Sequence, residues 1–313
     1  MKVTLIITTK NEETSILSLL ESICNQSEVP EEVVIADAGS TDRTVSLISR
    51  FKNKLSLRVL SLPASANRAV GRNHAIDQAS FEYILITDAG CVLDREWVKE
   101  MKLGFSKASV VAGFYQGRPE SKLEAAIVPY ALVMPDHLNV NDFLPATRSM
   151  GITKSIFTKV GRFSERLRYA EDYAFARKIV ELQIRIAVRP KAIVYWRPRS
   201  SLQSFSRMIY EHAFGDGYSY TFRPKVALIY IRYATWACLL AFVFLSPFLG
   251  VVYIGSILIY VLYSIKKNYR YAPYWQSLIN LPVLQLLSDL QVMLGTFQGM
   301  LKRKAEDFHE VVT

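Results

Sequence analysis

The sequence predicts an α/β domain with a mostly parallel sheet, followed by C-terminal transmembrane helices. Short β-branched runs alternate with amphipathic helical patterns in the first two thirds of the chain, and no charged residue occurs between Tyr233 and Ile265. The 313 residues are half hydrophobic, which suits one large domain with an appendage and excludes a disordered chain. Cys24, Cys91 and Cys238 are too scattered for a disulfide framework or a metal-binding spacing.

Four apolar runs are predicted to be strands, and most of them end in polar residues. They are residues 3–8, 33–36, 55–62 and 83–87. Ligands bind beyond the carboxyl ends of the strands in such sheets, and Glu12, Asp37 and Asp88 fall just past those ends. Three converging carboxylates can hold a ribose hydroxyl, a base edge or a divalent cation. The alternative is helix capping and turn chemistry, which we favour for Asp42 but not for Asp37 or Asp88.

At about 1.5 Å per residue, the uncharged stretch is too long for one membrane-spanning helix. Ser246-Pro247 interrupts it. We therefore predict two spans, 226–245 and 248–265, with Arg232 reaching toward the headgroups. A buried helical hairpin in a soluble core is the alternative. A third apolar segment, 275–301, is interrupted only by Asp289, and it contains glycines four residues apart that favour close helix packing.

Two basic clusters bear on the topology: one follows the second span at Lys266 and Lys267, and the other follows the third segment at 302–304. Both favour the cytoplasm, which one full crossing between them does not allow. Either the third segment is re-entrant or interfacial, or the rule fails at one cluster. We expect a multi-pass membrane protein with a cytoplasmic catalytic domain. The amphipathic segment 201–225 is either a helix at the membrane surface or an ordinary packed helix.

Five motifs, in this order along the chain, resemble those of glycosyltransferase family 2. They are Thr8-Thr9-Lys10-Asn11-Glu12, Asp37-Ala38-Gly39-Ser40-Thr41-Asp42, Arg72-Asn73, Asp88-Ala89-Gly90 and Glu171-Asp172. The resemblance covers roughly residues 2–217 and implies the GT-A fold, a Rossmann-like nucleotide-sugar domain. Together with the apolar segments, it predicts the organisation 1–200 for the GT-A domain, 201–225 for the amphipathic interfacial segment, 226–301 for the membrane region and 302–313 for the tail.

The resemblance also implies roles for individual residues. Those that would bind the donor nucleotide are Thr8, Thr9, Glu12, Asp37, Arg72, Asp88, Ala89 and Gly90. Asp172 matches the catalytic base, with Glu171 beside it, and Asp88 matches the first acid of the Asp-x-Asp metal motif. Gly90 stands where the family has its second acid, so Mg²⁺ or Mn²⁺ is only weakly expected. Such a metal would be held by Asp88 with phosphate oxygens, or by another residue such as Asp94 or His212.

Sugar transfer needs a neutralised diphosphate and a carboxylate that takes the proton of the attacking hydroxyl. We predict an inverting glycosyltransferase that moves a sugar from a nucleoside diphosphate sugar onto a lipid-linked or membrane-proximal acceptor at the bilayer. Because Gly90 replaces an acid, a catalytically inactive nucleotide-sugar-binding scaffold is the alternative. The net charge of +10 alone suggests nucleic acid, and we expect no such partner because the basic residues are scattered.

Overall fold

The computed structural model describes residues 1–221 and 223–312, with the side chains of 245 and 307–312 left aside, so the end of the predicted tail lies outside the described residues. The chain forms two compact units. The sheet unit comprises Met1–Arg118 and Val133–Arg197. The helical unit comprises Pro119–Leu132 and the chain from Pro198 onward. Residues 119–132 and 198–200, which the sequence prediction includes in the 1–200 domain, group with the helical unit here.

The sheet unit contains eight strands in one sheet, in the order β3-β2-β1-β4-β7-β6-β8-β5. Their bounds are β1 Val3–Thr9, β2 Glu32–Asp37, β3 Leu57–Ser61, β4 Tyr83–Asp88, β5 Cys91–Leu93, β6 Val110–Gly117, β7 Met150–Thr153 and β8 Ile186–Trp196. The first four strands in this order are mutually parallel. This confirms the α/β prediction, while β7 and β5 add antiparallel pairs that the sequence pattern did not indicate.

Helices cover both faces of this sheet, as consecutive residues of β1 show: Leu5, Ile6 and Ile7 are all fully buried. The helices of the sheet unit are α1 Ile16–Cys24, α2 Thr44–Ser49, α3 Arg68–Gln78, α4 Trp97–Phe105, α6 Lys154–Val160 and α7 Glu171–Glu181, with the short 3₁₀ helix η1 Pro135–His137. The apolar face of α1 repeats at helical spacing through Ile16, Leu19 and Ile23, which explains why this segment packs as a helix.

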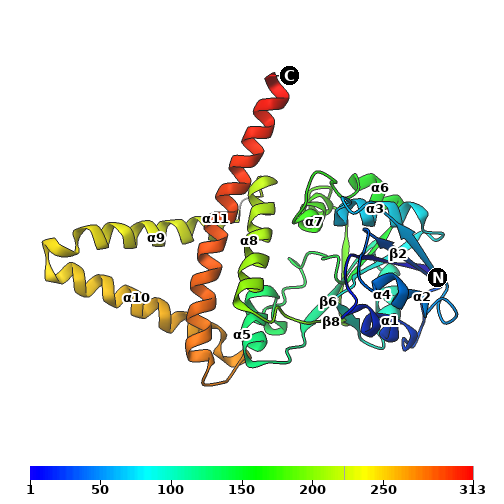
Figure 1. The fold of residues 1–313 in the computed structure, drawn as a ribbon, viewed down its shortest axis with the longest axis horizontal. Coiled ribbons are helices and arrows are strands. Elements are labelled where there is room, and N and C mark those ends of the chain that lie inside the picture. The colour runs from blue at the N-terminus through cyan, green and yellow to red at the C-terminus, as the bar shows by residue number, and fades with distance from the viewer. Residues whose placement is uncertain (222, 313) are drawn as a thin grey trace. The chain divides into compact units, whose positions relative to one another are not determined.

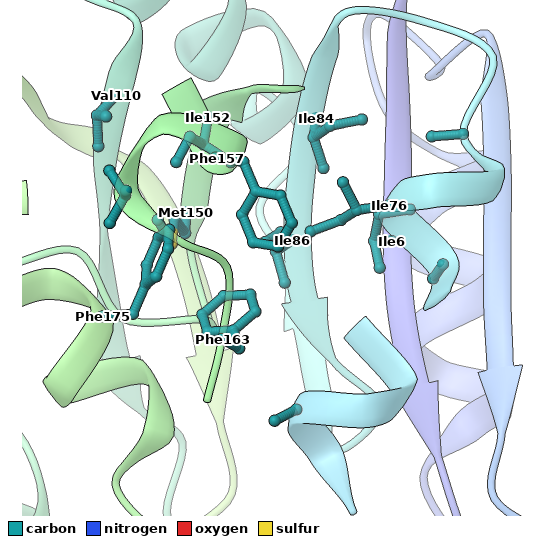
Figure 2. Close-up of a cluster of buried hydrophobic side chains, with 14 of the residues drawn as sticks. Ile6, Ile76, Ile84, Ile86, Val110, Met150, Ile152, Phe157, Phe163 and Phe175 are labelled. Carbon is teal, nitrogen blue, oxygen red and sulfur yellow. The ribbon is translucent and has the colours of Figure 1, made fainter. Parts of the chain in front are cut away.

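One buried hydrophobic cluster joins the central strands to α3, α6 and α7 (Figure 2). The rings of Phe163 and Phe175 lie 4.6 Å apart between centroids, and Phe157 packs 5.5 Å from each of them. Offset and tilted aromatic contacts of this kind are favourable beyond the area that they bury. Because Phe175 belongs to α7, the cluster fixes the position of the helix that begins with Glu171.

The helical unit is drawn from green through yellow to red in Figure 1. Its elements are α5 Lys122–Ala131, α8 Leu202–Tyr218, α9 Pro224–Phe242, η2 Val243–Leu245, α10 Pro247–Asn268, η3 Tyr269–Tyr271 and α11 Ser277–Val312. Ser246 caps α10 by accepting a hydrogen bond from the backbone N–H of Phe248 at the predicted break. Three of the described helices are long and apolar enough to cross a bilayer: Pro224–Phe242, Pro247–Tyr271 and Ser277–Glu306.

The backbones of α8 and α11 lie in close contact. A methyl group at Gly299 would come within 2.2 Å of the Phe214 carbonyl oxygen, and one at Gly217 within 2.3 Å of the Thr296 carbonyl oxygen. The apolar side chains of α8, such as Phe205 and Met208, are buried inside this unit. The structure therefore supports the packed-helix alternative for that face of α8, and the close-packing role expected of the α11 glycines is confirmed.

Arg232 was expected to reach toward the lipid headgroups. In the structure it forms an ion pair with Asp289 of α11. The Tyr260 hydroxyl donates to the same carboxylate at 2.6 Å, and the Gln285 amide donates at 3.0 Å. The guanidinium also lies 4.7 Å from the centroid of the Tyr260 ring. One charge of each sign is thus paired where α9, α10 and α11 meet, as expected for ionisable groups among apolar helices.

Candidate functional site

The strand register brings the predicted site residues to the carboxyl edge of the sheet. Thr8 lies opposite Asp88 in the β1–β4 pair, and Thr9 lies opposite Asp37 in the β1–β2 pair. Asp37 ends β2 and Asp88 ends β4, with β1 between the two strands. Neighbouring strands are about 4.8 Å apart, so the backbones at these two residues are about 10 Å apart. The convergence that the sequence predicted for these two acids is therefore present in the sheet.

Arg72 links two of the predicted acids from inside the protein. This α3 side chain is 2% exposed, and its guanidinium donates to Asp88 Oδ1 at 2.9 Å and to Glu171 Oε1 at 2.5 Å. The guanidinium also lies 5.7 Å from the centroid of the Phe163 ring in the hydrophobic cluster. A buried arginine with two charge-assisted hydrogen bonds holds its partners firmly, so Asp88 and Glu171 form one rigid group.

The two carboxyl groups bonded to Arg72 have opposite pKa shifts. Burial opposes ionisation of Asp88, but Arg72, Arg148 and Arg68 outweigh it and hold the pKa of Asp88 below its ordinary value. Burial raises the pKa of Glu171, and the neighbouring Asp172 adds to this, although Arg72 acts in the opposite direction. Asp88 is therefore held as an anion, whereas Glu171 ionises less readily than an ordinary glutamate.

The predicted base, Asp172, stands in the first turn of α7. Its Oδ1 accepts the backbone N–H of Tyr173 at 2.8 Å, and its Oδ2 lies 3.5 Å from the Thr147 hydroxyl. Ala170, just before the helix, adopts the left-handed conformation with φ 57°. Non-glycine residues seldom adopt this conformation, and it is enriched at functional sites. The sharp turn leaves Glu171 buried and Asp172 half-buried, so only the second acid faces outward.

Asp37 and Glu12 are committed mainly to local structure. The Asp37 carboxylate accepts the backbone N–H of Ser40 at 3.0 Å and the Ser40 hydroxyl at 2.5 Å, which closes a turn. The Glu12 carboxylate accepts the Ser15 hydroxyl before α1. Asp42 behaves as expected, because its Oδ1 accepts the backbone N–H of Thr44 at 3.0 Å near the start of α2.

Two buried polar atoms at this edge have no hydrogen-bond partner among the described residues. They are the Thr9 hydroxyl at the end of β1 and Nε of Arg72. Buried polar groups are almost always paired, and an unpaired one calls for an explanation such as a bound ligand. Thr9 was already predicted to bind the nucleotide, and its unpaired hydroxyl fits that role.

No motif in the sequence pointed to Arg148, which lies at the same edge. β7 begins at Met150, which pairs with Ile86 of β4, so Arg148 lies in the turn just before β7 and near the end of β4. The Thr87 hydroxyl donates to the Arg148 carbonyl at 2.8 Å, which ties the two segments together there. The Arg148 guanidinium lies 4.9 Å from the centroid of the Trp196 ring.

The described residues do not fit a metal centre at Asp88. One Asp88 oxygen accepts from Arg72, Gly90 has no side chain, and no cluster of three or more His, Cys, Asp or Glu side chains among the described residues could hold a metal. Burial raises the pKa of the Cys91 thiol to about 12, so this neighbour stays protonated. Asp94 instead accepts the Tyr195 hydroxyl at 3.3 Å, and His212 belongs to the helical unit.

Comparisons with known proteins agree with this arrangement. Residues 4–139 match the family described as Glycosyl transferase family 2. The poly(ribitol-phosphate) beta-N-acetylglucosaminyltransferase TarS of Staphylococcus aureus is 35% identical over 103 residues, which are 32% of this chain and 18% of TarS. The matched segment thus spans less than a fifth of that relative. The crystal structure of TarS residues 1–349 with UDP has a TM-score of 0.51 at 26% identity and covers 69% of this chain and 65% of that one.

Two further proteins match over about two thirds of the chain or more. The O-antigen chain rhamnosyltransferase RfbN of Salmonella typhimurium is 24% identical over 223 residues, which are 66% of this chain and 70% of RfbN. The mannosyltransferase PcManGT of Pyrobaculum calidifontis, solved with GDP-Man and Mn²⁺, has a TM-score of 0.65 at 20% identity and covers 91% of this chain and 87% of that one. The latter likeness shows the fold alone.

Proposed function

We infer that this chain, which carries a glycosyltransferase family 2 domain of the GT-A fold, transfers a sugar from a nucleoside diphosphate sugar to a hydroxyl group. The acceptor is a lipid-linked or membrane-proximal saccharide. Similar proteins are named as glycosyltransferases, and TarS has been crystallised with UDP. The transfer inverts the anomeric carbon, because one carboxylate base supports direct displacement.

The observation that carries this proposal is the arrangement of Asp172 next to the Arg72 network. Asp172 is half-buried at the start of α7, while Arg72 joins Asp88 to the buried Glu171 beside it. In the reaction, the acceptor oxygen forms a bond to the anomeric carbon and the bond from that carbon to the diphosphate oxygen breaks. The electron pair leaves with the diphosphate, and the acceptor proton passes to the Asp172 carboxylate.

An acceptor with a neutral hydroxyl explains why a base is present. A lipid phosphate is already ionised near neutral pH and needs no proton acceptor when it attacks. A sugar hydroxyl does need one, and general bases contribute about 10²- to 10⁴-fold to such steps. The presence of Asp172 therefore favours a saccharide hydroxyl over a free lipid phosphate.

The helical unit supports a membrane location for this reaction. Side chains such as Phe244 (94% exposed), Phe248 and Ile259 on α9–α10 and the turn between them are far more exposed than apolar residues of this size are in water-soluble domains. α9 has 19 residues, a length of about 28 Å that matches a hydrocarbon core of about 30 Å. Membrane attachment raises the effective concentration of the enzyme toward an acceptor held in the bilayer.

Only the α9–α10 hairpin crosses the bilayer in this proposal. Figure 1 shows the hairpin projecting sideways from α11 instead of running alongside it, so α11 and the hairpin do not share the membrane normal. Instead, α11 packs along α8, whose Arg207–Glu211 ion pair is partly exposed. With α11 at the surface, the basic residues after α10 and those near 302–304 lie on the same, cytoplasmic side. The positive-inside rule is then satisfied at both clusters.

The direct test replaces the base and, as a control, an exposed residue elsewhere on the sheet unit. Asp172→Asn should lower kcat for sugar transfer by about 10²- to 10⁴-fold while nucleotide affinity changes little. Arg50→Gln, an exposed position at the end of α2, is the control and should retain full activity. Equal turnover by wild type and Asp172→Asn would remove Asp172 from the mechanism. Absence of turnover by wild type with every donor would favour the inactive scaffold that Gly90 suggests.

A further inference from the structure

We propose that Arg148, and not a divalent cation, neutralises the diphosphate of the donor at Asp88. The inference rests on the proposed function and adds the group that meets the leaving charge. Three independent observations carry it: the position of Arg148, the unused hydrogen-bonding capacity of its guanidinium, and the space beside Gly90.

The position of Arg148 follows from the sheet. Arg148 stands in the turn just before β7, and the hydrogen bond from the Thr87 hydroxyl to its carbonyl oxygen holds it beside the end of β4. The positive charge of Arg148 acts on the Asp88 carboxylate, as does that of Arg68. The next residue back, Thr147, points its hydroxyl toward Asp172. Arg148 thus lies beside Asp88 and directly follows the residue whose hydroxyl faces the proposed base.

The guanidinium of Arg148 lies over aromatic rings and is not bonded to a carboxylate. Trp196 lies 4.9 Å and Tyr115 5.8 Å from it, measured to the ring centroids. Among the residues that the structure describes, it donates no side-chain hydrogen bond and forms no ion pair. A cation–π contact holds an arginine near the ring while leaving its N–H groups available for hydrogen bonds. A diphosphate offers the paired oxygen atoms that this fork binds best.

The space beside Gly90 completes the argument. A methyl group built at Gly90 would meet no atom within 4 Å, and Gly90 does not have a left-handed φ. The second acid of the family motif would therefore fit this position sterically. Glycine is not needed here for lack of space, and what it removes from the site is a carboxylate. With one carboxylate already bonded to Arg72, the site lacks the oxygen donors that Mg²⁺ or Mn²⁺ prefers. Cations fixed to the protein stand there instead.

The test measures binding of inorganic pyrophosphate, UDP and GDP to the full-length protein in detergent by calorimetry, with either EDTA or Mn²⁺. Arg148→Gln should weaken pyrophosphate binding, and binding of the nucleotide that the wild type binds, by about tenfold to hundredfold. Arg148→Lys should lose less affinity than Arg148→Gln, and the control Arg50→Gln should bind as tightly as wild type. For wild type, EDTA in place of Mn²⁺ should change affinity by less than about threefold.

Gly90→Asp provides the complementary gain. This variant should bind nucleoside diphosphate weakly in EDTA and at least about tenfold more tightly in Mn²⁺, with Gly90→Ala as the steric control. The inference is wrong if EDTA weakens wild-type binding tenfold or more, or if Arg148→Gln binds as wild type does. Sugar transfer by wild type in either case would leave the proposed function standing. If Arg148→Gln loses pyrophosphate binding but wild type transfers no sugar, the role of Arg148 stands and the proposed function is wrong.

Discussion

Arg72 and Glu171 are 99 residues apart in the sequence, yet their side chains meet at 2.5 Å inside the sheet unit. The contact joins α3 to the first residue of α7, and through Asp88 it reaches the end of β4. The three motifs that were separate in the sequence thus form one electrostatic unit.

Removing the Arg72 guanidinium should destabilise the protein as well as inactivate it. Arg72→Ala leaves the 4% exposed Glu171 without its ion-pair partner, and breaking a buried pair costs about 3–5 kcal/mol. We expect the thermal unfolding midpoint in detergent to fall by on the order of 10 °C. Arg43→Ala, which breaks an ion pair whose arginine is 80% exposed, should shift it by less than about 2 °C. Similar shifts for both would contradict the network.

Acid should selectively abolish the contribution of Asp88. Its folded-state pKa is depressed, so its stabilising effect is present above the unfolded value of about 3.9 and is lost as the pH falls through the lower folded value. Wild type should therefore unfold at a higher temperature than Asp88→Asn at neutral pH. The gap between the two midpoints should close in acid. A gap that stays constant over the whole pH range would show that Asp88 acts through packing alone.

The native cysteines report on membrane insertion. Cys238 in α9 is exposed in the structure, whereas Cys91 is buried. If lipid surrounds the hairpin, a water-soluble maleimide should fail to label Cys238 in intact vesicles and should label it after unfolding in detergent. Rapid labelling of Cys238 in vesicles would place α9 in water.

The same chemistry tests how many times the chain crosses. In a Cys24→Ala, Cys91→Ala and Cys238→Ala background, Ser246→Cys at the hairpin turn should react with an impermeant maleimide on intact cells. Lys304→Cys should react only after lysis, because α11 does not cross. Labelling of Lys304→Cys from outside would instead make α11 a third span.

The Arg232–Asp289 pair should be needed to hold the hairpin on α11. Asp289 is 3% exposed on its side chain, so Arg232→Ala leaves an unpaired buried carboxylate at a cost of about 3–5 kcal/mol. We expect less folded protein by fluorescence-detected gel filtration. Arg232→Asp combined with Asp289→Arg should recover part of the loss, whereas Lys266→Ala, an exposed control, should have no effect. A swap no better than the single variant would argue against direct pairing.

Local patterns in the sequence were enough to predict the parallel half of the sheet. β1, β2 and β4 are apolar runs that end in recognisable polar motifs, so both their class and the acids at their ends were predicted. The break at Ser246-Pro247 likewise marks the α9–α10 turn, because the Ser246 side chain caps the second helix.

Features that depend on distant pairing could not be predicted in this way. β7 has only four residues, too few for a periodic pattern, and its antiparallel pairing with β4 is what brings Arg148 to Asp88. The packing of α5 with the helical unit is equally non-local, since the Tyr130 hydroxyl bonds to the Leu281 carbonyl 151 residues away. The division into sheet and helical units therefore differs from a boundary drawn along the chain.

The central claim is that this chain moves a sugar from a nucleotide to an acceptor at the membrane by means of Asp172. Membranes containing wild type or Asp172→Asn would be incubated with a panel of radiolabelled nucleoside diphosphate sugars, and the label in the lipid extract would be counted. We predict that at least one donor labels the extract with wild type and that Asp172→Asn reduces this signal about 100-fold or more. Equal labelling by both proteins, or no labelling from any donor, would contradict the account.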